Sequence, residues 1–466
     1  MHVIAVGGSD AGISAALRAR EVDPACEVTV VVADAYPNFS ICGIPYLISG
    51  EVAHWANLAH RTVADLEATG MRLQLDTRVT GIDVDRHGVW MRLPDGRDSF
   101  LEYDALVVGT GAAPVRPPID GLDGADALGP ADGVHLLHTM GDTFSLERTL
   151  DERRPETALI VGAGYVGLEM ADGLTLRGLR VSQVEMLPEV LPTVDPELGS
   201  LVRAELDNNG VDVTTATKIG RIAGAESGGA GRLRVEGVGP QGQAQAWEVD
   251  LVLVSVGVRP DTSLLVAAGA ETGAGGAVVV DEAMRTGLAD VYAAGDCVVT
   301  HHRLLGTTYL PLGTTAHKQG RVAGENAVGG RARFAGSLGT QVVKVFDIVA
   351  ARTGLRQHEA VAAGYEAATT QSTPDDHKAY YPTAHAIVSR VTGDPATGRL
   401  LGAQLVGRRG TEVAKRIDTF ATAIHNDMTV EAMSELDLSY TPPLGSPWDA
   451  VQVAAQAWVR HHGADR

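Results

Sequence analysis

The sequence predicts an α/β protein with two doubly wound units followed by a C-terminal α+β unit. Three observations lead to this prediction. A strand, a glycine-rich loop, a helix and a second strand follow one another near the start of the chain, the same order recurs from residue 158, and the last third lacks such a loop. This order is the repeating unit of doubly wound sheets. The 466 residues suffice for about three domains.

The two copies are similar in length and composition. In the first copy the four elements cover residues 3–6, 7–12, 13–20 and 27–32, and in the second they cover 158–161, 162–167, 168–176 and 180–184. Each copy continues into β-rich segments with hairpin turns such as Asp95-Gly96. Each then closes with an apolar strand, at 105–108 and at 251–256.

The remainder of the chain predicts a mixed domain. Strand-like segments at 341–349, 385–391 and 400–406 precede a helical segment at 412–425. We therefore expect three domains: a discontinuous first domain at 1–113 and 260–328, a second at 114–259, and a third at 329–466.

The composition restricts the partners of the protein. The formal net charge of −20 would repel the phosphates of nucleic acids and acidic membrane surfaces. Neither a charged and apolar leader before the first strand nor an apolar run of membrane-spanning length is present in the sequence. We expect a cytoplasmic protein that binds neither nucleic acid nor membrane.

The three cysteines are Cys26, Cys42 and Cys297. Their odd number and wide spacing predict neither a disulfide framework nor a metal site. We expect Cys26 and Cys297 to be buried, inert thiols. Cys42 differs, because Pro45 follows it and marks the start of a helix. A helix N-terminus favours the thiolate, so we expect a reactive Cys42 with a lowered pKa.

The second glycine loop predicts a dinucleotide site. Gly162-x-Gly164-x-x-Gly167 follows a strand and opens a helix, where backbone amides accept a pyrophosphate. Glu185 ends the next strand, at about the 20 residues expected for an acid that binds a ribose 2′-hydroxyl. Met186 and Leu187 supply no guanidinium for a 2′-phosphate. We therefore predict NADH, and NADPH less readily.

The first loop is less regular but predicts a second dinucleotide. Ser9 replaces the middle glycine between Gly7 and Gly12, and Asp34 is the acid that follows the second strand. Two later segments support the assignment: Thr110-Gly111, directly after the strand at 105–108, and Asp296, at the end of 293–296.

Five motifs together resemble one protein family. They lie at residues 38–46, 162–169, 293–296, 312–321 and 436–443. The chain resembles the FAD-dependent pyridine nucleotide–disulfide oxidoreductases over nearly its whole length. It is most similar to their single-cysteine branch, which contains coenzyme A disulfide reductase, NADH oxidase and NADH peroxidase.

The resemblance implies two sets of cofactor contacts. The FAD contacts would be Gly7, Gly12, Asp34, Val79, Thr110, Gly111 and Asp296, with the amides of Thr314, Thr315 and Ala316 beside the flavin pyrimidine ring. The family usually has glutamate two positions before Asp34, where this chain has Val32. The NADH contacts would be Gly162, Gly164, Tyr165, Gly167, Glu169 and Glu185. Tyr165 would cover the nicotinamide side of the flavin, and Glu169 would lie near the nicotinamide amide.

The resemblance also implies three catalytic residues. Cys42 would rest as a mixed disulfide with a small thiol, or as a sulfenic acid in the oxidase and peroxidase branch. Tyr440 would come from the second subunit of a homodimer and face Cys42. Asp10 stands where the oxidase and peroxidase branch has histidine. It would raise the pKa of the thiol when charged or donate a proton when neutral.

Other positions also depart from known branches. Asn38 and Ile41 replace the serine and asparagine typical of the coenzyme A branch. Arg18, Arg20 and Arg61 are either phosphate ligands for an anionic thiol or solvated surface charges.

Four functions agree with these residues. The first is an NADH-dependent reductase that passes electrons through flavin and Cys42 to a low-molecular-weight disulfide or persulfide. The second is an NADH oxidase or peroxidase with a Cys42 sulfenic acid. The third is an electron-transfer flavoprotein that reduces a protein partner, and the fourth a flavin-binding sensor or scaffold.

Overall fold

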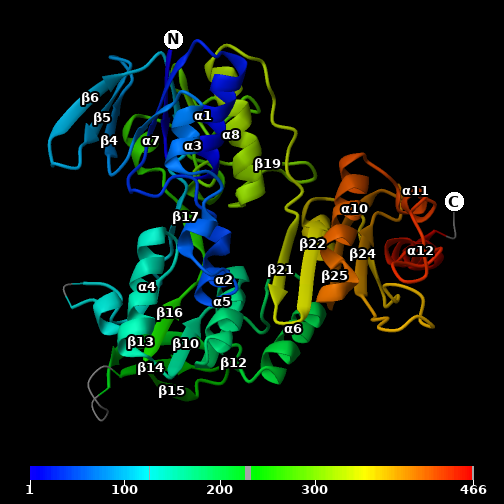
Figure 1. Ribbon diagram of the computed structural model, residues 1–466. Helices are drawn as coiled ribbons and strands as arrows, with labels where there is room; N and C mark the ends of the chain where they lie inside the picture. The colour runs from blue at the N-terminus through cyan, green and yellow to red at the C-terminus, as the bar shows by residue number, and fades with distance from the viewer. Residues whose placement is uncertain (125, 226–231, 464–466) are drawn as a thin grey trace.

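The computed structural model describes residues 1–124, 126–225 and 232–463. Figure 1 shows three bodies: one with the N-terminus and α1, one with β10 and α5, and one with the C-terminus and α12. Within the described ranges, no helix combines the length and apolarity that a membrane span requires.

The first body contains a parallel sheet in the order β18-β7-β1-β2-β3. Its strands are β1 His2–Val6, β2 Glu27–Val31, β3 Arg72–Gln74, β7 Ala105–Val108 and β18 Val291–Ala293. The sheet thus joins the start of the chain to a strand that comes after the whole second body. Every residue of β7 is buried, because helices and loops cover both faces of the sheet.

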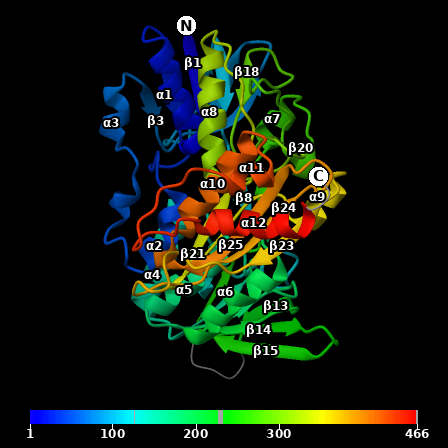
Figure 2. The same ribbon diagram turned by 90° about the vertical axis from the view of Figure 1, so that its right-hand side faces the viewer.

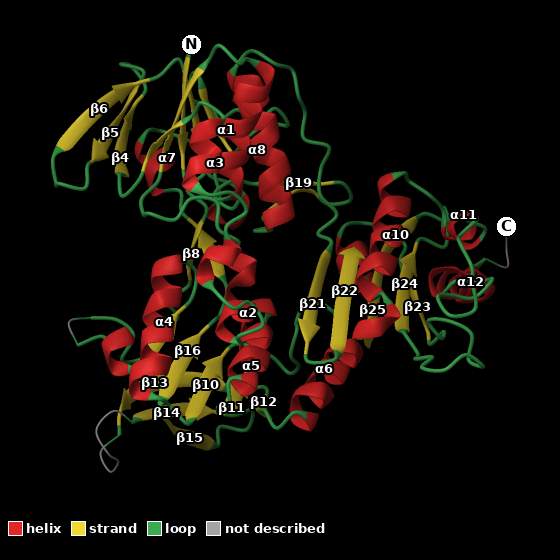
Figure 3. Cartoon of the chain, in the orientation of Figure 1, coloured by secondary structure: helices red, strands yellow, loops and turns green. Residues whose placement is uncertain are grey.

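Smaller elements complete the first body (Figure 3). The helices are α1 Asp10–Val22, α2 Ile44–Ile48, α3 Val63–Ala68, α7 Ser263–Ala267 and α8 Gly313–Ala327. The remaining strands are β4 Arg78–Asp83, β5 Gly88–Arg92, β6 Asp98–Glu102, β8 Ala112–Pro114, β17 Val258–Pro260, β19 Thr300–His302 and β20 Gly306–Thr308. The predicted turn at Asp95-Gly96 joins β5 to β6, with Gly96 at φ +82°.

The helices α1 and α8 lie in backbone contact. A Cβ added to Gly320 would stand 2.4 Å from the carbonyl oxygen of Ala11, and one added to Gly324 would stand 2.1 Å from that of Ala15. Neither position has room for a side chain. The two helices that begin at the edge of the first sheet are therefore held at a fixed distance from each other.

The second body repeats the doubly wound plan, with the sheet order β12-β11-β10-β16-β9. Its parallel strands are β9 Val134–Leu136, β10 Thr157–Val161, β11 Arg180–Val184, β12 Asp212–Thr214 and β16 Leu251–Val254. The antiparallel strands are β13 Lys218–Gly224, β14 Leu233–Val238 and β15 Ala244–Val249, and the helices are α4 Met140–Arg153, α5 Tyr165–Leu176 and α6 Pro196–Asn208.

The third body is an antiparallel sheet covered by helices (Figure 2). The sheet has the order β21-β22-β25-β24-β23, with strands β21 Gln341–Val345, β22 Ile348–Gly354, β23 Ala368–Ser372, β24 Val388–Gly393 and β25 Leu400–Arg408. The helices are α9 Gln357–Ala362, α10 Val413–His425, α11 Val430–Ser434 and α12 Ala450–His462. The single strand expected at 341–349 is wrong. Phe346 adopts φ +50° and turns the chain between β21 and β22.

Candidate active site

Cys42 lies in a turn where the first two bodies meet. A short 3-10 turn covers Ile41–Gly43, and α2 begins at Ile44 with Pro45 in its first turn. The helix α2 packs on α5, since a Cβ on Gly173 would stand 3.0 Å from the carbonyl oxygen of Pro45. Cys42 is exposed, whereas Cys26 and Cys297 are buried as expected. Of the three thiols, only Cys42 is accessible to a substrate.

The pKa of the Cys42 thiol is raised, so the expected lowered pKa is wrong for this chain. Although the side chain is accessible, desolvation by the protein around the thiol makes the largest contribution, followed by the negative charges of Glu169, Asp10 and Asp296. The helix that follows has only five residues, so its dipole is weak. The three carboxylates come from α5, from α1 and from the loop after β18, and together with the desolvation of the thiol they outweigh the effect of the short helix.

Asp10 is paired with a histidine of α8. Its Oδ1 lies 3.3 Å from Nε2 of His317, and the Nδ1 of His317 lies 2.9 Å from the Oγ of Ser14 on α1. His60 stacks edge-on with His317, at 6.4 Å between ring centroids. Burial raises the pKa of Asp10, and the two histidines oppose this shift. A carboxyl, two imidazoles and a hydroxyl thus lie together on the Cys42 side of the first sheet.

Glu169 belongs to a second polar cluster beside Cys42. The Tyr46 hydroxyl donates a hydrogen bond of 2.9 Å to Oε1 of Glu169. Burial raises the pKa of Glu169 to about 7, although Tyr46 and Lys344 favour the charged form. Lys344 of β21 pairs with Asp172 of α5 at 2.8 Å. The cluster therefore joins all three bodies next to the accessible thiol.

The first glycine loop has the close backbone contacts that its sequence predicts. Gly7 has φ +112°, and a Cβ there would stand 2.1 Å from the carbonyl oxygen of Gly109. A Cβ on Gly12 would stand 2.1 Å from the carbonyl oxygen of Gly7. Gly111, at φ +72°, faces open space, and the preceding Thr110 hydroxyl donates to the carbonyl of Asp261.

The other residues expected at the FAD site come from several elements of the first body. Asp34 accepts a hydrogen bond from the amide of Tyr36 at 2.9 Å, and Val79 pairs with Met91 in the β4–β5 ladder. The pKa of Asp296 is raised to about 6 by burial and by Asp10, and its carboxylate forms no hydrogen bond with any described residue. Thr314, Thr315 and Ala316 form the first turn of α8.

The second glycine loop leaves its middle position free. A Cβ on Gly162 would meet the carbonyl oxygen of Ser255 at 2.2 Å, and one on Gly167 would meet that of Gly162 at 2.3 Å. Gly164, at the start of α5, has no atom within 4 Å of such a Cβ. Two positions therefore hold the turn tight, and the third is open for a ligand to approach the backbone.

Glu185 closes this loop from the end of β11. It is only 8 % exposed, and its oxygens accept hydrogen bonds from the amides of Ala163 at 2.7 Å and Leu187 at 2.8 Å. A carboxylate oxygen can accept two hydrogen bonds and each oxygen of Glu185 accepts one here, so Glu185 keeps acceptor capacity for a hydroxyl. Tyr165, at the start of α5, accepts a hydrogen bond from Thr193.

Known protein families provide an independent comparison. The family model described as "Pyridine nucleotide-disulphide oxidoreductase" matches residues 1–320, and the dimerisation-domain model of the same family matches residues 340–450. The chain belongs to this family. Membership makes it an oxidoreductase enzyme and implies a flavin and a nicotinamide nucleotide.

Individual relatives of this oxidoreductase match it along its length. An "NADH oxidase" of Methanocaldococcus jannaschii is 32 % identical, with 98 % of each chain covered. An "NAD(P)H sulfur oxidoreductase (CoA-dependent)" of Pyrococcus abyssi is also 32 % identical, with 97 % of each chain covered. The solved structure of an NAD-dependent persulfide reductase from A. fulgidus is 35 % identical, with a TM-score of 0.91. The match covers 99 % of this oxidoreductase and 84 % of that chain.

Tyr440 of this oxidoreductase lies in an exposed aromatic patch on the third body. It follows α11, and its hydroxyl is hydrogen-bonded to Tyr380. Tyr381, Leu444 and Trp448 are exposed as well, and the exposed fraction of Leu444 is 78 %. Residue 440 is thus placed on the outer surface of the family's dimerisation domain.

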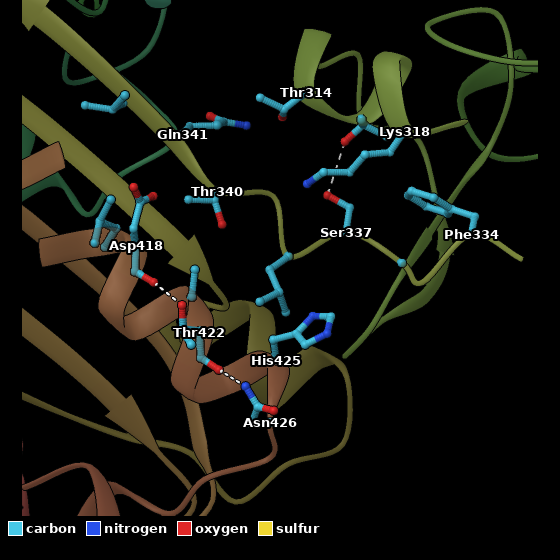
Figure 4. A pocket seen from close by; sticks show the side chains of 16 residues that line it. Thr314, Lys318, Phe334, Ser337, Thr340, Gln341, Asp418, Thr422, His425 and Asn426 are labelled. Carbon is cyan, nitrogen blue, oxygen red and sulfur yellow. Dashed lines mark hydrogen bonds between the residues drawn. The ribbon is translucent and has the colours of Figure 1, made fainter. Parts of the chain in front are cut away.

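A cavity of about 510 Å³ lies between the start of α8 and α10 (Figure 4). Lys318 extends from α8 toward Ser337, and Thr422 and His425 of α10 lie on the opposite wall. Thr314 lines the same cavity. The first turn of α8 therefore faces a hollow that reaches the third body.

Sequence reasoning assigned no role to several residues near Cys42. His317 and Tyr46 lie inside two of the motifs that resemble the family. Their polar side chains were the only feature of the sequence that could have indicated a role for them. Lys344 gave no signal, because its partner Asp172 is 172 positions away. Arg18 pairs with Glu325 and Glu21, and Arg20 binds backbone carbonyls. Both arginines are therefore committed to contacts within the protein.

Proposed function

We propose that this protein is an FAD-dependent, NADH-using reductase of a low-molecular-weight disulfide or persulfide, with Cys42 as its redox-active residue. One observation carries the proposal: Cys42 is an accessible thiol at the junction of two dinucleotide folds, and the other two cysteines are buried. A single thiol that forms a transient disulfide with its substrate needs no second cysteine in the chain.

The residues of the first body suit FAD. Gly7 and Gly12 allow the approach of a pyrophosphate to the start of α1, and Gly111 is open. The Asp296 carboxylate is partly buried without a hydrogen bond to any described residue, and a ribityl hydroxyl would satisfy it. Val79 and Asp34 would lie at the adenosine end, and Thr314, Thr315 and Ala316 at the pyrimidine end. When bound, the flavin would accept a hydride from the nicotinamide and supply an electron pair to sulfur.

The second body suits NADH. Gly164 leaves its backbone open to a pyrophosphate, with Gly162 and Gly167 holding the turn. Glu185 would accept the ribose 2′-hydroxyl, and its charge would repel a 2′-phosphate. Tyr165 and Glu169 would border the nicotinamide.

Cys42 would exchange sulfur bonds with the acceptor. Its sulfur bonds to one sulfur of the disulfide, and the other sulfur leaves as a thiolate that takes up a proton. The raised pKa of Cys42 means that its own proton must leave before this attack. The electron pair that originates from NADH would then break the bond between Cys42 and the retained sulfur, which leaves as the second thiol with a further proton. In total the acceptor receives two electrons and two protons, which NADH and one solvent proton balance.

The names of the relatives support a sulfur acceptor and also give the second candidate. The Pyrococcus abyssi and A. fulgidus proteins are named for sulfur and persulfide reduction. The Methanocaldococcus jannaschii relative is named for oxidase activity, which favours an NADH oxidase with a Cys42 sulfenic acid as the alternative. Asp10 argues for the reductase, because the oxidase and peroxidase branch is expected to have histidine at that position.

An anaerobic NADH titration of the purified protein tests the proposal. Uptake of two NADH per flavin would show a second redox centre beside the flavin. The titrated protein would then be mixed with coenzyme A disulfide, cystine, a persulfide, peroxide and oxygen. Fastest reoxidation by a disulfide or persulfide supports the reductase, and fastest reoxidation by oxygen or peroxide supports the alternative.

We also propose the assembly and the domain assignment. Residues 1–113 with 260–328 would hold FAD, 114–259 would hold NADH, and 329–466 would form the interface of a homodimer. The exposed patch around Tyr440 supports the homodimer, because a second copy would cover it and bring Tyr440 to the partner's active site.

A further inference from the structure

Disulfide reduction consumes a proton that NADH does not supply. For a disulfide, R–S–S–R′, NADH and H⁺ give R–SH, R′–SH and NAD⁺, and for a persulfide one product is H₂S. A site that releases thiols at neutral pH therefore needs a group that delivers one solvent proton per turnover. The Cys42 site contains a set of side chains able to do so.

We infer that Asp10 and His317 form a proton relay between solvent and the sulfur at Cys42, an inference that rests on the proposed reductase function. Asp10 is the inner member, because it lies in the first turn of α1, is the less exposed of the two, and contributes to the raised pKa of the Cys42 thiol. His317 is the outer member, with its side chain 45 % exposed against 24 % for Asp10. The two atoms that would share the proton, Oδ1 of Asp10 and Nε2 of His317, lie 3.3 Å apart.

The Ser14 hydroxyl can form a hydrogen bond with the His317 imidazole in either charge state of the ring. A hydroxyl accepts a hydrogen bond from Nδ1 when that nitrogen carries a proton and donates one when it does not. The 2.9 Å contact between Ser14 Oγ and Nδ1 can therefore persist while Nε2 gains and loses its proton. Histidine is also the side chain whose charge changes most readily near neutral pH.

The bonds in the relay balance. The O–H bond of the Asp10 carboxyl breaks as an S–H bond forms on the leaving thiolate. Nε2 of His317 then returns a proton to Asp10, and water reprotonates the imidazole. Burial raises the pKa of Asp10, which favours the protonated carboxyl that the first step needs. No electron passes through either residue.

Several charged or titratable groups face this pair and would influence it. They are Cys42, His60 on the loop before α3 and Asp296 after β18. An acid in the first turn of a helix also stabilises the helix dipole. That role would require neither the burial of Asp10 nor its histidine partner.

Anaerobic stopped-flow measurements on the FAD-loaded protein test the relay, with cystine and coenzyme A disulfide as acceptors. His317→Gln and Asp10→Asn should each slow the acceptor half-reaction by about 10²-fold at pH 7, with flavin reduction by NADH unchanged. Imidazole should restore His317→Ala, since this side chain is partly exposed. His358→Gln on α9 is the matched control, because His358 is exposed and belongs to the third body whereas the pair belongs to the first, and it should behave as wild type.

A second readout does not depend on turnover. The pH dependence of Cys42 alkylation by iodoacetamide should move to lower pH in Asp10→Asn. The thiol has a raised pKa and titrates at alkaline pH, where Asp10 has lost its proton, and the amide removes that negative charge. Wild-type acceptor kinetics in both relay variants, equal slowing of both half-reactions, failure of imidazole rescue or an unmoved alkylation profile would each overturn the relay. Failure of the proposed function is distinct: wild-type protein itself would then reduce no disulfide.

Discussion

At the scale of single residues, Cys42 is the position on which the proposed chemistry depends. In Cys42→Ser we expect FAD binding and flavin reduction by NADH to persist, because other segments build both nucleotide sites. Disulfide turnover should fall by at least about 10³-fold, as expected for the loss of a covalent nucleophile. Rapid-mixing absorbance spectra would follow both half-reactions and should lose any thiolate-to-flavin band.

The buried Cys26 provides the matched control. Cys26→Ala removes a thiol that is 1 % exposed, so disulfide turnover should remain at the wild-type level. Wild-type disulfide reduction in Cys42→Ser would instead favour an electron-transfer flavoprotein that reduces a protein partner.

Glu185 should set the nucleotide preference. We expect kcat/KM for NADH to exceed that for NADPH by on the order of 10²-fold, because a carboxylate beside a 2′-phosphate costs several kcal/mol. Glu185→Gln should reduce this ratio about tenfold, since the amide keeps an acceptor and removes the charge. Steady-state kinetics with both nucleotides would measure the change.

Glu189 is the comparison acid for this test. Like Glu185, it lies on the loop that follows β11, but it pairs with Arg203 at 2.9 Å. Glu189→Gln should therefore leave the ratio of kcat/KM for NADH to that for NADPH unchanged. A wild-type preference for NADPH would contradict the role of Glu185.

At the scale of elements, α2 meets α5 where Tyr46 donates a hydrogen bond to Glu169, and this contact makes the free energy of unfolding depend on pH. Burial raises the pKa of Glu169 from 4.5 to about 7, so the folded protein keeps a proton that the unfolded chain has lost between these pH values. Stability should therefore fall as pH rises through this window, by up to about 3 kcal/mol. Glu169→Gln removes the titration and should be stabilised relative to wild type at pH 8 more than at pH 5.

Urea unfolding of the FAD-loaded proteins at the two pH values would measure this difference. Glu431→Gln on α11 replaces an exposed acid and should leave the pH dependence unchanged. If the free energy of unfolding changed equally between pH 5 and pH 8 in wild type and in Glu169→Gln, the Glu169 carboxyl would not titrate between these pH values.

The elements around Cys42 also show what sequence can predict. The glycine loops, the buried Cys26 and Cys297 and the helix start at Pro45 depend on neighbours in the chain, and the sequence predicted them. The predicted lowering of the Cys42 pKa was wrong, because the burial of the thiol and the charges of Glu169 and Asp296 near it arise only in the folded protein. The contribution of Asp10 to the raised pKa agrees with the sequence-based expectation for a charged carboxylate. The pairing of Ser14 with His317, 303 positions apart, had no local pattern to reveal it.

At the scale of the whole molecule, the aromatic patch predicts an obligatory dimer. Leu444 and Trp448 are exposed on the dimerisation domain, so Leu444→Asp with Trp448→Asp should give a monomer in sedimentation equilibrium. The monomer should still reduce its flavin with NADH and should lose disulfide turnover. Tyr440→Phe should preserve the dimer and slow the acceptor half-reaction by roughly tenfold.

Val361 on α9 is a matched control for the patch. It is 55 % exposed and lies on another element, so Val361→Asp should leave the protein dimeric and active. Full disulfide turnover by the monomer would contradict a site shared between subunits.

The backbone contact between α1 and α8 also bears on how related sequences diverge. Gly320 and Gly324 leave no room for a side chain, so a descendant with a larger residue at either position must move the helices apart. That movement would separate Asp10 from His317 and shift the first turn of α8 as well. In sequences that keep both glycines, the spacing of α1 and α8 stays the same. Residues 10 and 317 can then be substituted as a pair, so the chemistry at this site can change while the fold is unchanged.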